Sequence, residues 1–317
     1  MIINFLDSHS MSLNDDLDFS PLEKLGAYNA HSITNDDDIV SFSKDSEIII
    51  TNKIEIDNKI IESLPKLGLI CVIATGYNVV DVVAAARKNI PVLNVPNYAQ
   101  HSVSQHTFAL ILALASKICS YRSDVKKGKW QSSDSFSLLS YPTFELAGKT
   151  MGIIGFGAIG RKTAQIARSF DMEVVASDIS DTEKYGYKNS TLDEVLKASD
   201  ILSVHIPLTP DTKDLITRKE LKKMKPNAYI INTSRGGIIN EEDLAWALNE
   251  DVIAGAGIDV LTKEPPTEGN PLLADIKNII VTPHVAWSSK EARQRLIDIT
   301  AENIKSFLRG DIKNRVN

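Results

Sequence analysis

One stretch of the chain, residues 148–178, carries the residue types that a dinucleotide site needs. The apolar run Thr150–Ile154 predicts a short buried strand, and Gly155, Gly157 and Gly160 follow it with the spacing G-x-G-x-x-G. In such a turn the first glycine permits a tight bend and the second lets a pyrophosphate approach the backbone. The third lets the next helix pack closely on the strand. The pattern therefore predicts a phosphate-binding strand–turn–helix.

The helix and strand after this turn complete the prediction. The helix is expected to begin at Ala158, so that the free N–H groups of its first turn, including that of Ile159, face the phosphates. The next strand, Glu173–Ser177, ends in Asp178, whose carboxylate can accept hydrogen bonds from ribose hydroxyls and would repel a 2′-phosphate. Because no Lys or Arg occupies residues 179–182, the sequence predicts NAD rather than NADP. In the alternative interpretation, the glycines only shape a turn and Asp178 caps a loop.

Three polar residues, Arg235, Glu264 and His284, each follow a predicted strand by a few residues. Ligands of open α/β sheets bind beyond the carboxyl ends of the strands, so these side chains are expected at the ligand-binding edge. Arginine can hold a substrate carboxylate in a bidentate pair, and histidine can give a proton to a carbonyl oxygen as a hydride reaches the carbon. A glutamate beside the imidazole favours its charged form and fixes its orientation. Together the three residues predict a hydride-transfer site, although each alone could be an ordinary loop residue.

Composition limits the class of protein and its partners. The chain has 317 residues, 43% hydrophobic and 24% charged, which predicts a globular protein of two domains. A net charge of −6 argues against a nucleic-acid or anionic-membrane partner, and Cys71 and Cys119 have no spacing typical of a metal site or a disulfide framework. The N-terminus lacks the pattern of a signal peptide, and the longest apolar run, Phe108–Ala115, is too short to span a bilayer. We therefore expect a cytoplasmic protein without a metal.

Strands that alternate with helices predict a doubly wound parallel α/β fold for both halves of the chain. In the first domain the acidic cluster at 35–38 and Asn78 are expected to cap helices, and a last helix, Lys290–Leu308, is expected to return to it. A helix from Gln100 to about Cys119 is apolar on nearly all sides, so we expect it to be buried between domains or in a subunit interface. The serine-rich stretch Lys126–Pro142 is expected to be a long loop.

Seven stretches of sequence, taken in order, match the motifs of one family. They are ATGYNVVDVVAAARKNIPVLNVP (74–96), SVSQHTFALILALA (102–115), ELAGKTMGIIGFGAIGR (145–161), SVHIPLTPDTKDLI (203–216), MKPNAYIINTSRGGIINEEDLAWAL (224–248), GAGIDVLTKEPP (255–266) and NPLL with NIIVTPHVAWSSKEARQR (270–295). With these motifs the chain resembles the D-isomer-specific 2-hydroxyacid dehydrogenases over nearly its whole length. Trp287 and the motif QHTF (105–108) are most similar to the glycerate dehydrogenase (hydroxypyruvate reductase) branch of that family.

The resemblance implies a domain arrangement and an assembly. It implies a flavodoxin-like substrate domain formed by residues 1–97 and 290–317. A Rossmann NAD-binding domain, residues 98–289, is inserted into that domain. It also implies a homodimer formed through the cofactor domain, for which the apolar helix over 102–115 is suited.

The resemblance also implies a reaction. It is the NAD(H)-dependent reduction of a small 2-oxo acid, hydroxypyruvate or glyoxylate, to the D-2-hydroxy acid, glycerate or glycolate. The catalytic residues of the family match Arg235, Glu264 and His284, with His284 as the acid/base. The alternatives are D-lactate dehydrogenase, 3-phosphoglycerate dehydrogenase, and a non-catalytic NAD(H) sensor similar to the co-repressors related to this family.

Binding roles follow from the resemblance residue by residue. The positions that match cofactor contacts are Thr107, Gly155, Gly157, Ala158, Ile159, Gly160, Asp178, His205, Pro207, Thr212, Thr233, Ser234 and Asp259. The positions that match substrate contacts are Thr75, Gly76, Tyr77, Arg235, His284 and Trp287. For His205 a structural role at a strand end is an equal alternative, and His101 and His106 are expected to have only packing or capping roles in a helix.

Overall fold

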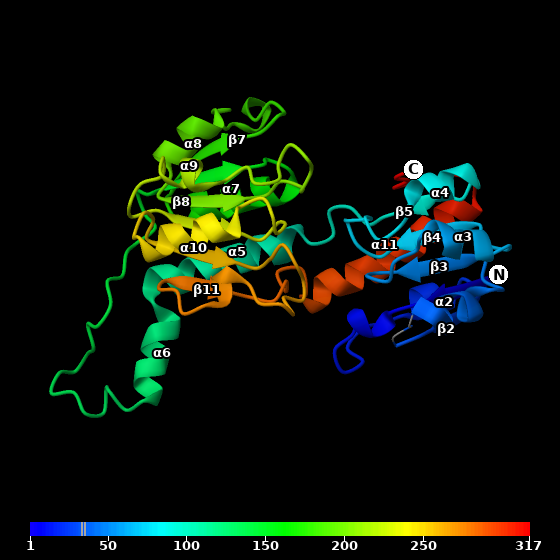
Figure 1. Cartoon of the computed structure of the whole chain (residues 1–317), viewed down its shortest axis with the longest axis horizontal. Coiled ribbons are helices and arrows are strands. Elements are labelled where there is room, and N and C mark those ends of the chain that lie inside the picture. Colours follow the sequence, from blue (N-terminus) through cyan, green and yellow to red (C-terminus); the bar gives the residue numbers. More distant parts are fainter. Residues whose placement is uncertain (33, 35) are drawn as a thin grey trace. The chain divides into compact units, whose positions relative to one another are not determined.

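The computed structural model describes residues 1–32, 34 and 36–317 and divides into two compact units. The first unit comprises Met1–Tyr98 and Ser288–Asn317, and the second comprises Ala99–Trp287. In each unit parallel strands alternate with helices around one sheet (Figure 1). The predicted fold class, two doubly wound parallel α/β domains with one inserted into the other, is confirmed.

The first unit is built on a five-stranded parallel sheet with strand order β2-β1-β3-β4-β5. Its strands are β1 (Ile2–Phe5), β2 (Ala27–Ala30), β3 (Ile48–Thr51), β4 (Leu69–Val72) and β5 (Val92–Leu93). Its helices are η1 (Ser8–Ser10), α1 (Ser20–Glu23), α2 (Asp36–Ser43), α3 (Asn58–Ser63), α4 (Val82–Arg87) and α11 (Lys290–Leu308). All residues of β3 and β4 are buried, whereas β2 lies at the edge and is largely exposed. The sequence did not predict β2 because an exposed edge strand has no apolar run.

Two helices of the first unit begin at short acidic side chains. Asp57 and Asp81 each accept a hydrogen bond of 2.8 Å from the backbone N–H three residues ahead, and so cap α3 and α4. The predicted cap of α4 at Asn78 is therefore wrong, because the helix begins one turn later. Of the capping cluster expected at 35–38, Asn35 and the side chains of Asp36 and Asp37 lie outside the described residues.

The end of the chain completes the first unit. The backbone N–H of Val316 donates to the carbonyl of Val92 in β5 at 2.9 Å. From α11, the guanidinium of Arg293 donates to both carboxylate oxygens of Asp16, at 2.8 and 2.6 Å, and to the carbonyl of Met11 at 2.8 Å. Hydrogen bonding to this guanidinium holds the pKa of Asp16 well below its usual range. Arg293 is only 7% exposed, and its hydrogen bonds connect α11 to the segment after β1.

Replacing Arg293 by methionine is expected to destabilise the first unit. The change removes the three hydrogen bonds that the guanidinium donates to Asp16 and to the Met11 carbonyl, and it leaves Asp16 with the N–H of Leu13 as a donor. The loss should exceed that of a fully exposed ion pair, because the Arg293 side chain is largely buried. The measurement is differential scanning calorimetry. The control is Arg309→Met, which breaks an exposed pair with Glu302 and should lower the melting temperature less than Arg293→Met does. Equal melting temperatures for the two variants would contradict the assignment.

The second unit is built on a six-stranded parallel sheet with strand order β11-β10-β9-β8-β6-β7. Its strands are β6 (Thr150–Ile154), β7 (Glu173–Ser177), β8 (Ile201–Val204), β9 (Tyr229–Asn232), β10 (Gly255–Ile258) and β11 (Ile279–Val281). Its helices are α5 (Gln100–Ser116), α6 (Ile118–Lys126), α7 (Ala158–Ser169), η2 (Glu183–Tyr185), α8 (Leu192–Ala198), α9 (Arg218–Leu221), α10 (Glu241–Asn249) and η3 (Pro271–Leu273).

The apolar helix α5 packs inside its own domain. It lies against α7 and against β9, β10 and β11, and Phe108, Ile111 and Leu114 are buried in one cluster with Met151 and Ile153 of β6. The sheet and α7 of the same unit thus cover much of this helix. Its burial between domains or in a subunit interface stays a prediction. Among the described helices, none alone is long and apolar enough to cross a membrane, and only α5 and α6 together, bent by 60°, pass that test.

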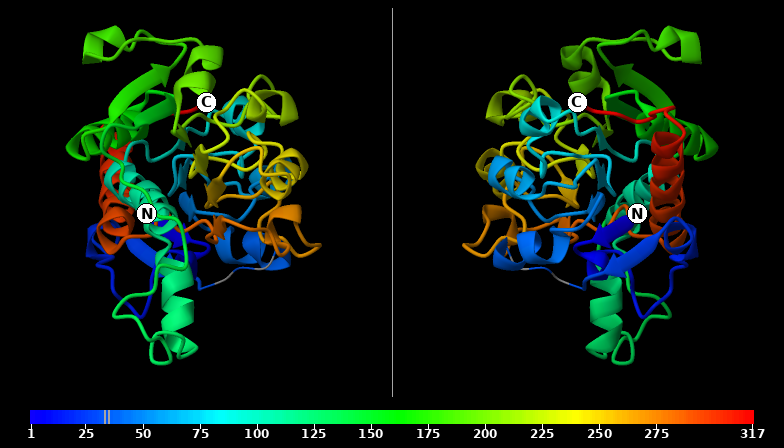
Figure 2. Two further views of the ribbon diagram at one scale, coloured as in Figure 1. Left: turned by 90° about the vertical axis from the view of Figure 1, so that its left-hand side faces the viewer. Right: turned by 90° about the vertical axis from the view of Figure 1, so that its right-hand side faces the viewer.

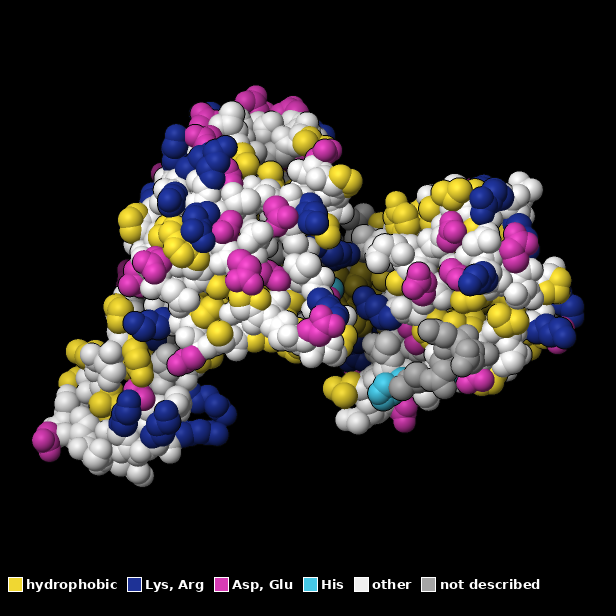
Figure 3. Space-filling model, viewed as in Figure 1, with side chains coloured by type: hydrophobic (Ala, Val, Ile, Leu, Met, Phe, Trp, Pro, Cys, Tyr) yellow, Lys and Arg dark blue, Asp and Glu magenta, His cyan; other side chains and the backbone are white. Residues whose placement is uncertain are grey.

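A helix that the sequence did not predict, α6, extends with the segment after it away from the rest of the second unit (Figures 1 and 2). Lys117 ends α5 in the left-handed conformation, with φ of +53°, and the chain turns there into α6. Residues 118–142, here called the arm, include the predicted loop. Figure 3 shows apolar and basic side chains together on this projection. Phe136 and Leu139 are 92% and 91% exposed.

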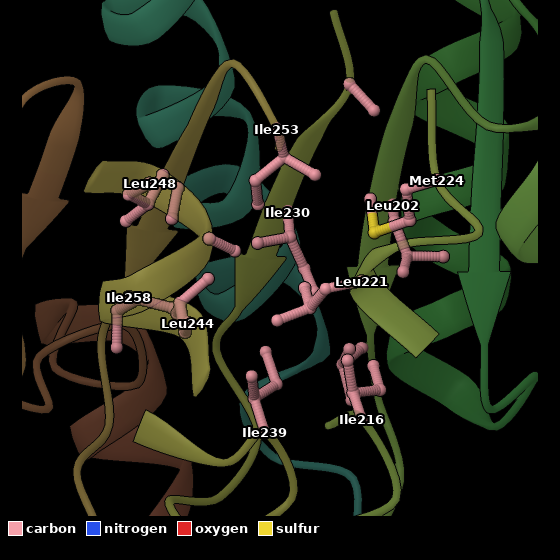
Figure 4. Packing of buried hydrophobic residues seen from close by; sticks show 14 of the residues in the cluster. Leu202, Ile216, Leu221, Met224, Ile230, Ile239, Leu244, Leu248, Ile253 and Ile258 are labelled. Atoms are coloured by element: carbon pink, nitrogen blue, oxygen red, sulfur yellow. The ribbon is translucent and has the colours of Figure 1, made fainter. Parts of the chain in front are cut away.

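The main core of the second unit lies between its sheet and helices α8, α9 and α10. Figure 4 shows Ile230 of β9 among the side chains of Leu221 from α9 and Leu244 from α10. Every residue of β8, β9 and β10 is buried. The loops at the carboxyl ends of these strands are therefore anchored on a well-packed sheet.

Candidate functional site

The strand order places the glycine turn at a topological switch point of the sheet. In the second sheet the chain adds β7 on one side of β6 and then crosses to add β8 on the other side. Ligands of doubly wound sheets bind beyond the carboxyl ends of the strands at such a switch point. The turn at 155–157 follows β6 and the segment at 205–207 follows β8, so both lie at the switch point.

The glycine turn combines close packing with open space. A Cβ on Gly160 would lie 2.1 Å from the carbonyl oxygen of Gly155, so α7 can approach the turn only because residue 160 is glycine. Apart from Gly157 itself and its chain neighbours, no heavy atom of the described residues lies within 4 Å of a Cβ built on Gly157. None of the described side chains caps α7, whereas α8, α10 and α11 each have a side-chain cap. The N–H groups of Ala158 and Ile159 at the start of α7 can therefore serve an anion. The turn fits the pyrophosphate of a dinucleotide.

Asp178 is a fixed anion at the end of β7. Its carboxylate accepts hydrogen bonds from the N–H of Phe156 and from the N–H and hydroxyl of Ser180, the last two at 2.7 and 2.6 Å. Partial burial raises the pKa of Asp178, but these hydrogen bonds and the charge of Arg161 outweigh burial and place it below its ordinary value. The carboxylate is therefore ionised at neutral pH and tied to the glycine turn, which fits the ribose of a dinucleotide.

The loops after adjacent strands bring Glu264 and His284 together. Because β9, β10 and β11 are neighbours, Arg235, Glu264 and His284 follow three adjacent carboxyl ends. Nδ1 of His284 lies 2.6 Å from Oε2 of Glu264, and Oε1 accepts a hydrogen bond of 2.8 Å from the N–H of Leu261. An ionised carboxylate can only accept, so Nδ1 carries a hydrogen and Nε2 is the nitrogen that can exchange a proton with a ligand.

Arg235 lies on a turn that Asn232 builds. The Asn232 side chain accepts hydrogen bonds from the N–H and hydroxyl of Ser234, at 3.0 and 2.8 Å, and donates to the carbonyl of Arg235 at 2.9 Å. The Arg235 guanidinium is exposed and donates to the carbonyl of Ser234 at 2.7 Å. A Cβ on Gly236 would lie 2.0 Å from backbone of the loop that carries Glu264, so the two loops touch. Sequence reasoning missed Asn232, although Asn two residues before Ser at a strand end is a turn signal.

The backbone at His284 is held by Asp259, which is 1% exposed. The Asp259 carbonyl accepts from the N–H of His284 at 2.7 Å. Its Oδ1 and Oδ2 accept from the next two N–H groups, those of Val285 at 3.0 Å and Ala286 at 2.9 Å. These bonds keep His284 in the left-handed conformation, with φ of +53°, which is uncommon for a residue other than glycine. The carboxylate of Asp259, a position matched to cofactor contacts, thus serves the His284 loop.

Two consecutive side chains of α5 reach the same group of loops. Thr107 is fully buried, and its hydroxyl lies 3.0 Å from that of Thr233, just after β9. Nε2 of the neighbouring His106 lies 3.0 Å from the hydroxyl of Thr282, just after β11. Sequence reasoning gave His106 only a packing or capping role, whereas it bonds to the loop that carries His284.

The other predicted positions lie in three places. The hydroxyl of Thr212 donates to the carbonyl of Pro207 at 2.7 Å and closes the loop after β8. Trp287 is the last residue of the second unit and is half-buried. Residues 75–77 lie in the first unit after β4, where the hydroxyl of Thr75 donates to the carbonyl of Val95 at 2.9 Å.

His205 is the buried titratable group at the switch point. Its Nε2 lies 2.9 Å from the hydroxyl of Ser203, and its Nδ1 is buried without a hydrogen-bond partner. Burial lowers the pKa of His205 to about 4, so the ring is neutral at pH 7. Other parts of the residue are partly exposed, but both ring nitrogens face the interior.

The buried His205 is expected to make the second unit less stable in acid. In the unfolded chain the ring binds a proton below a pH of about 6.5, while in the folded state it stays neutral down to about 4, so stability falls as pH falls through this window. Between pH 7 and 5 the loss is about 2 kcal/mol from this group. Urea unfolding can be followed by tryptophan fluorescence, because all three tryptophans lie in the second unit. His205→Gln should reduce the loss, and His101→Gln, an exposed control, should not; equal losses in both variants would refute the assignment.

Comparison with known proteins identifies the family. A sequence model described as "D-isomer specific 2-hydroxyacid dehydrogenase, NAD binding domain" matches residues 108–286. The chain is 41% identical over 323 aligned residues to a hydroxypyruvate reductase of Blautia hydrogenotrophica, with 100% of each chain covered. It is 43% identical to a glycerate dehydrogenase of Methylorubrum extorquens, with 88% of each chain covered. The chain belongs to the D-isomer-specific 2-hydroxyacid dehydrogenase family.

A solved structure has the same fold along its whole chain. An acyclic imino acid reductase in complex with NADPH and D-Arg aligns over 100% of both chains, with a TM-score of 0.86 and 31% identity. As a D-2-hydroxyacid dehydrogenase the chain is an oxidoreductase. Its second unit contains the matched residues and is the NAD-binding domain of the family. The predictions of the family, of an enzyme and of NAD as the cofactor are confirmed.

Proposed function

We propose that this dehydrogenase reduces hydroxypyruvate or glyoxylate with NADH to the D-2-hydroxy acid, with His284 as the acid/base. The observation that carries the proposal is the 2.6 Å contact between His284 and Glu264 at the sheet edge that also carries the glycine turn. The names of the relatives, hydroxypyruvate reductase and glycerate dehydrogenase, support this choice of substrate.

The chemistry divides between the cofactor and the chain. Bound NADH supplies the hydride for the carbonyl carbon of the substrate. Arg235, whose guanidinium is exposed at the same edge, pairs with the substrate carboxylate and polarises the adjacent carbonyl oxygen. His284 gives that oxygen a proton from Nε2 as the hydride arrives, and Glu264 accepts from Nδ1 and stabilises the imidazolium before this transfer. The imidazole then regains a proton from solvent.

We assign the first unit to substrate binding. The loop at 75–77 is exposed or half-exposed and follows the buried strand β4, so its backbone N–H groups can bind a carboxylate. We add Trp287 as a substrate contact because it follows His284 by three residues and is half-buried. NAD is preferred over NADP because Asp178, an ionised side chain, would repel a 2′-phosphate.

The first test of this function is NADH oxidation by the purified protein near neutral pH. Hydroxypyruvate, glyoxylate, pyruvate and phosphohydroxypyruvate are compared, and each is repeated with NADPH. We expect the highest kcat/KM for hydroxypyruvate or glyoxylate with NADH. Preference for pyruvate or phosphohydroxypyruvate would move the substrate to the lactate or phosphoglycerate branch. Binding of NADH without turnover of any substrate would instead favour the sensor alternative.

In the same assay, His284→Ala is expected to lower kcat about 10²- to 10⁴-fold with little change in the Kd for NADH. Glu264→Gln keeps the size of the side chain and an acceptor for Nδ1 but removes the charge, so its loss of kcat should be smaller than that of His284→Ala. A His284→Ala enzyme with kcat within a few-fold of wild type would exclude His284 as the acid/base.

We also propose that two copies pair through the arm. The arm exposes large apolar side chains, above all Phe136 and Leu139. Large apolar patches on a protein surface mark sites of protein–protein interaction. Wild-type protein should sediment at about twice 34.9 kDa, and Phe136→Ser combined with Leu139→Ser should bring the mass toward 34.9 kDa. Leu13→Ser, at a 65% exposed leucine of the first unit, is the control. A monomeric wild type would exclude this pairing.

A further inference from the structure

A chain of hydrogen bonds connects α5 to the buried carboxylate of Asp259. The hydroxyl of Thr282 donates to Asp259 Oδ1 at 2.6 Å, and Nε2 of His106 lies 3.0 Å from the same hydroxyl. Nε2 of His106 is also 3.5 Å from Asp259 Oδ1, and the Asp259 side chain is completely buried. Among the described residues, no lysine or arginine nitrogen forms an ion pair with this carboxylate.

The available hydrogens determine which group donates in each of these hydrogen bonds. Both oxygens of the Asp259 side chain accept hydrogen bonds from backbone N–H groups, and the Thr282 hydroxyl donates its single hydrogen to Oδ1. The 3.0 Å contact with His106 can then be a hydrogen bond only if Thr282 accepts and the imidazole donates. His106 must therefore carry a hydrogen on Nε2, either as the Nε2–H tautomer or as the imidazolium.

We propose that His106 is a positioning residue for the reaction: as an Nε2–H donor it orients Thr282, which in turn fixes the Asp259 carboxylate that holds the loop of His284. The inference rests on the proposed role of His284 as the acid/base. The His106 side chain is only half-buried, so packing of α5 alone does not require a histidine at this position.

The consequence falls on the backbone of His284. Asp259 accepts from Thr282, Val285 and Ala286 through its two carboxylate oxygens, so its rotation depends on all three donors. If Thr282 is free to turn its hydroxyl away, one carboxylate oxygen loses its strongest partner and the left-handed His284 loses part of its support. A displacement of about 1 Å at an acid/base can cost on the order of 10²-fold in rate.

The kinetic test replaces each member of the chain. His106→Leu and Thr282→Val remove the donor and the linking hydroxyl, and each is expected to lower kcat roughly tenfold to a hundredfold. The Kd for NADH should stay within about threefold of wild type. His106→Gln places an amide N–H where Nε2 stood, and Thr282→Ser keeps the hydroxyl, so both should retain kcat within about threefold. His101→Leu, at an exposed histidine of the same helix, is the matched control and should leave kcat unchanged.

The double variant separates a relay from two independent losses. If His106 acts through Thr282, the combination of His106→Leu and Thr282→Val should lower kcat no further than about threefold beyond the worse single variant. Multiplicative losses would overturn the inference, as would loss of kcat in His106→Gln equal to that in His106→Leu. If His106→Leu and Thr282→Val lowered the melting temperature equally but left kcat unchanged, His106 would contribute to stability alone. That result would also overturn the inference.

A direct test uses wild-type protein and needs no activity. In ¹⁵N-histidine-labelled protein, the signals of His106 can be assigned by their absence from His106→Gln. We expect a hydrogen on Nε2 throughout pH 6–9, and a neutral Nδ1–H tautomer in that range would overturn the proposal. The two proposals fail separately. Unchanged kcat in His284→Ala would remove the proposed acid/base, whereas unchanged kcat in His106→Leu beside an inactive His284→Ala would remove only the positioning role.

Discussion

A buried negative charge organises the carboxyl edge of the second sheet. The Asp259 side chain is shielded from water, and its oxygens accept hydrogen bonds from Thr282, Val285 and Ala286 in the loop after β11. Such a group is costly to leave partly satisfied, so the loop has one arrangement that satisfies it and few that come close. The left-handed backbone at His284 belongs to that arrangement. The geometry of the candidate site is thus set by the need to satisfy a carboxylate that itself faces no substrate.

The parallel sheet supplies the rigidity that this arrangement needs. β9, β10 and β11 run side by side with fixed register, so the loops that follow them begin at fixed places. Tight backbone contacts then lock loop to loop, as at Gly236, where any side chain would collide with the loop after β10. Helix α5, which packs on the sheet, adds side-chain hydrogen bonds to the loops after β9 and β11. Rigid strands, touching loops and one covering helix together leave little freedom to the side chains at the edge.

Local patterns in the sequence predicted the features that depend on local structure. The glycine turn, Asp178 and the six strands of the second unit follow from apolar runs and the residues after them. Glu264 could be paired with His284 because adjacent parallel strands end at one edge. The contact of His106 with Thr282 joins residues 176 apart in sequence, and only the packed position of α5 selects it. The apolar character of α5 was read correctly as burial, but apolarity does not say which surface does the covering. The end of α5 at Lys117 was not predicted, because no sequence pattern indicates a lysine in the left-handed conformation.

The inserted arrangement of the two units has a consequence for synthesis of the chain. The ribosome completes Met1–Tyr98 first, but α11 and the strand-pairing residues after it emerge only when all of Ala99–Trp287 has been made. Until then the nascent first unit lacks the helix that carries Arg293, and β5 lacks its bond from Val316. The second unit, encoded without interruption, can therefore reach its native state while the first is still incomplete. The unit whose synthesis begins second is thus the first whose sequence is complete.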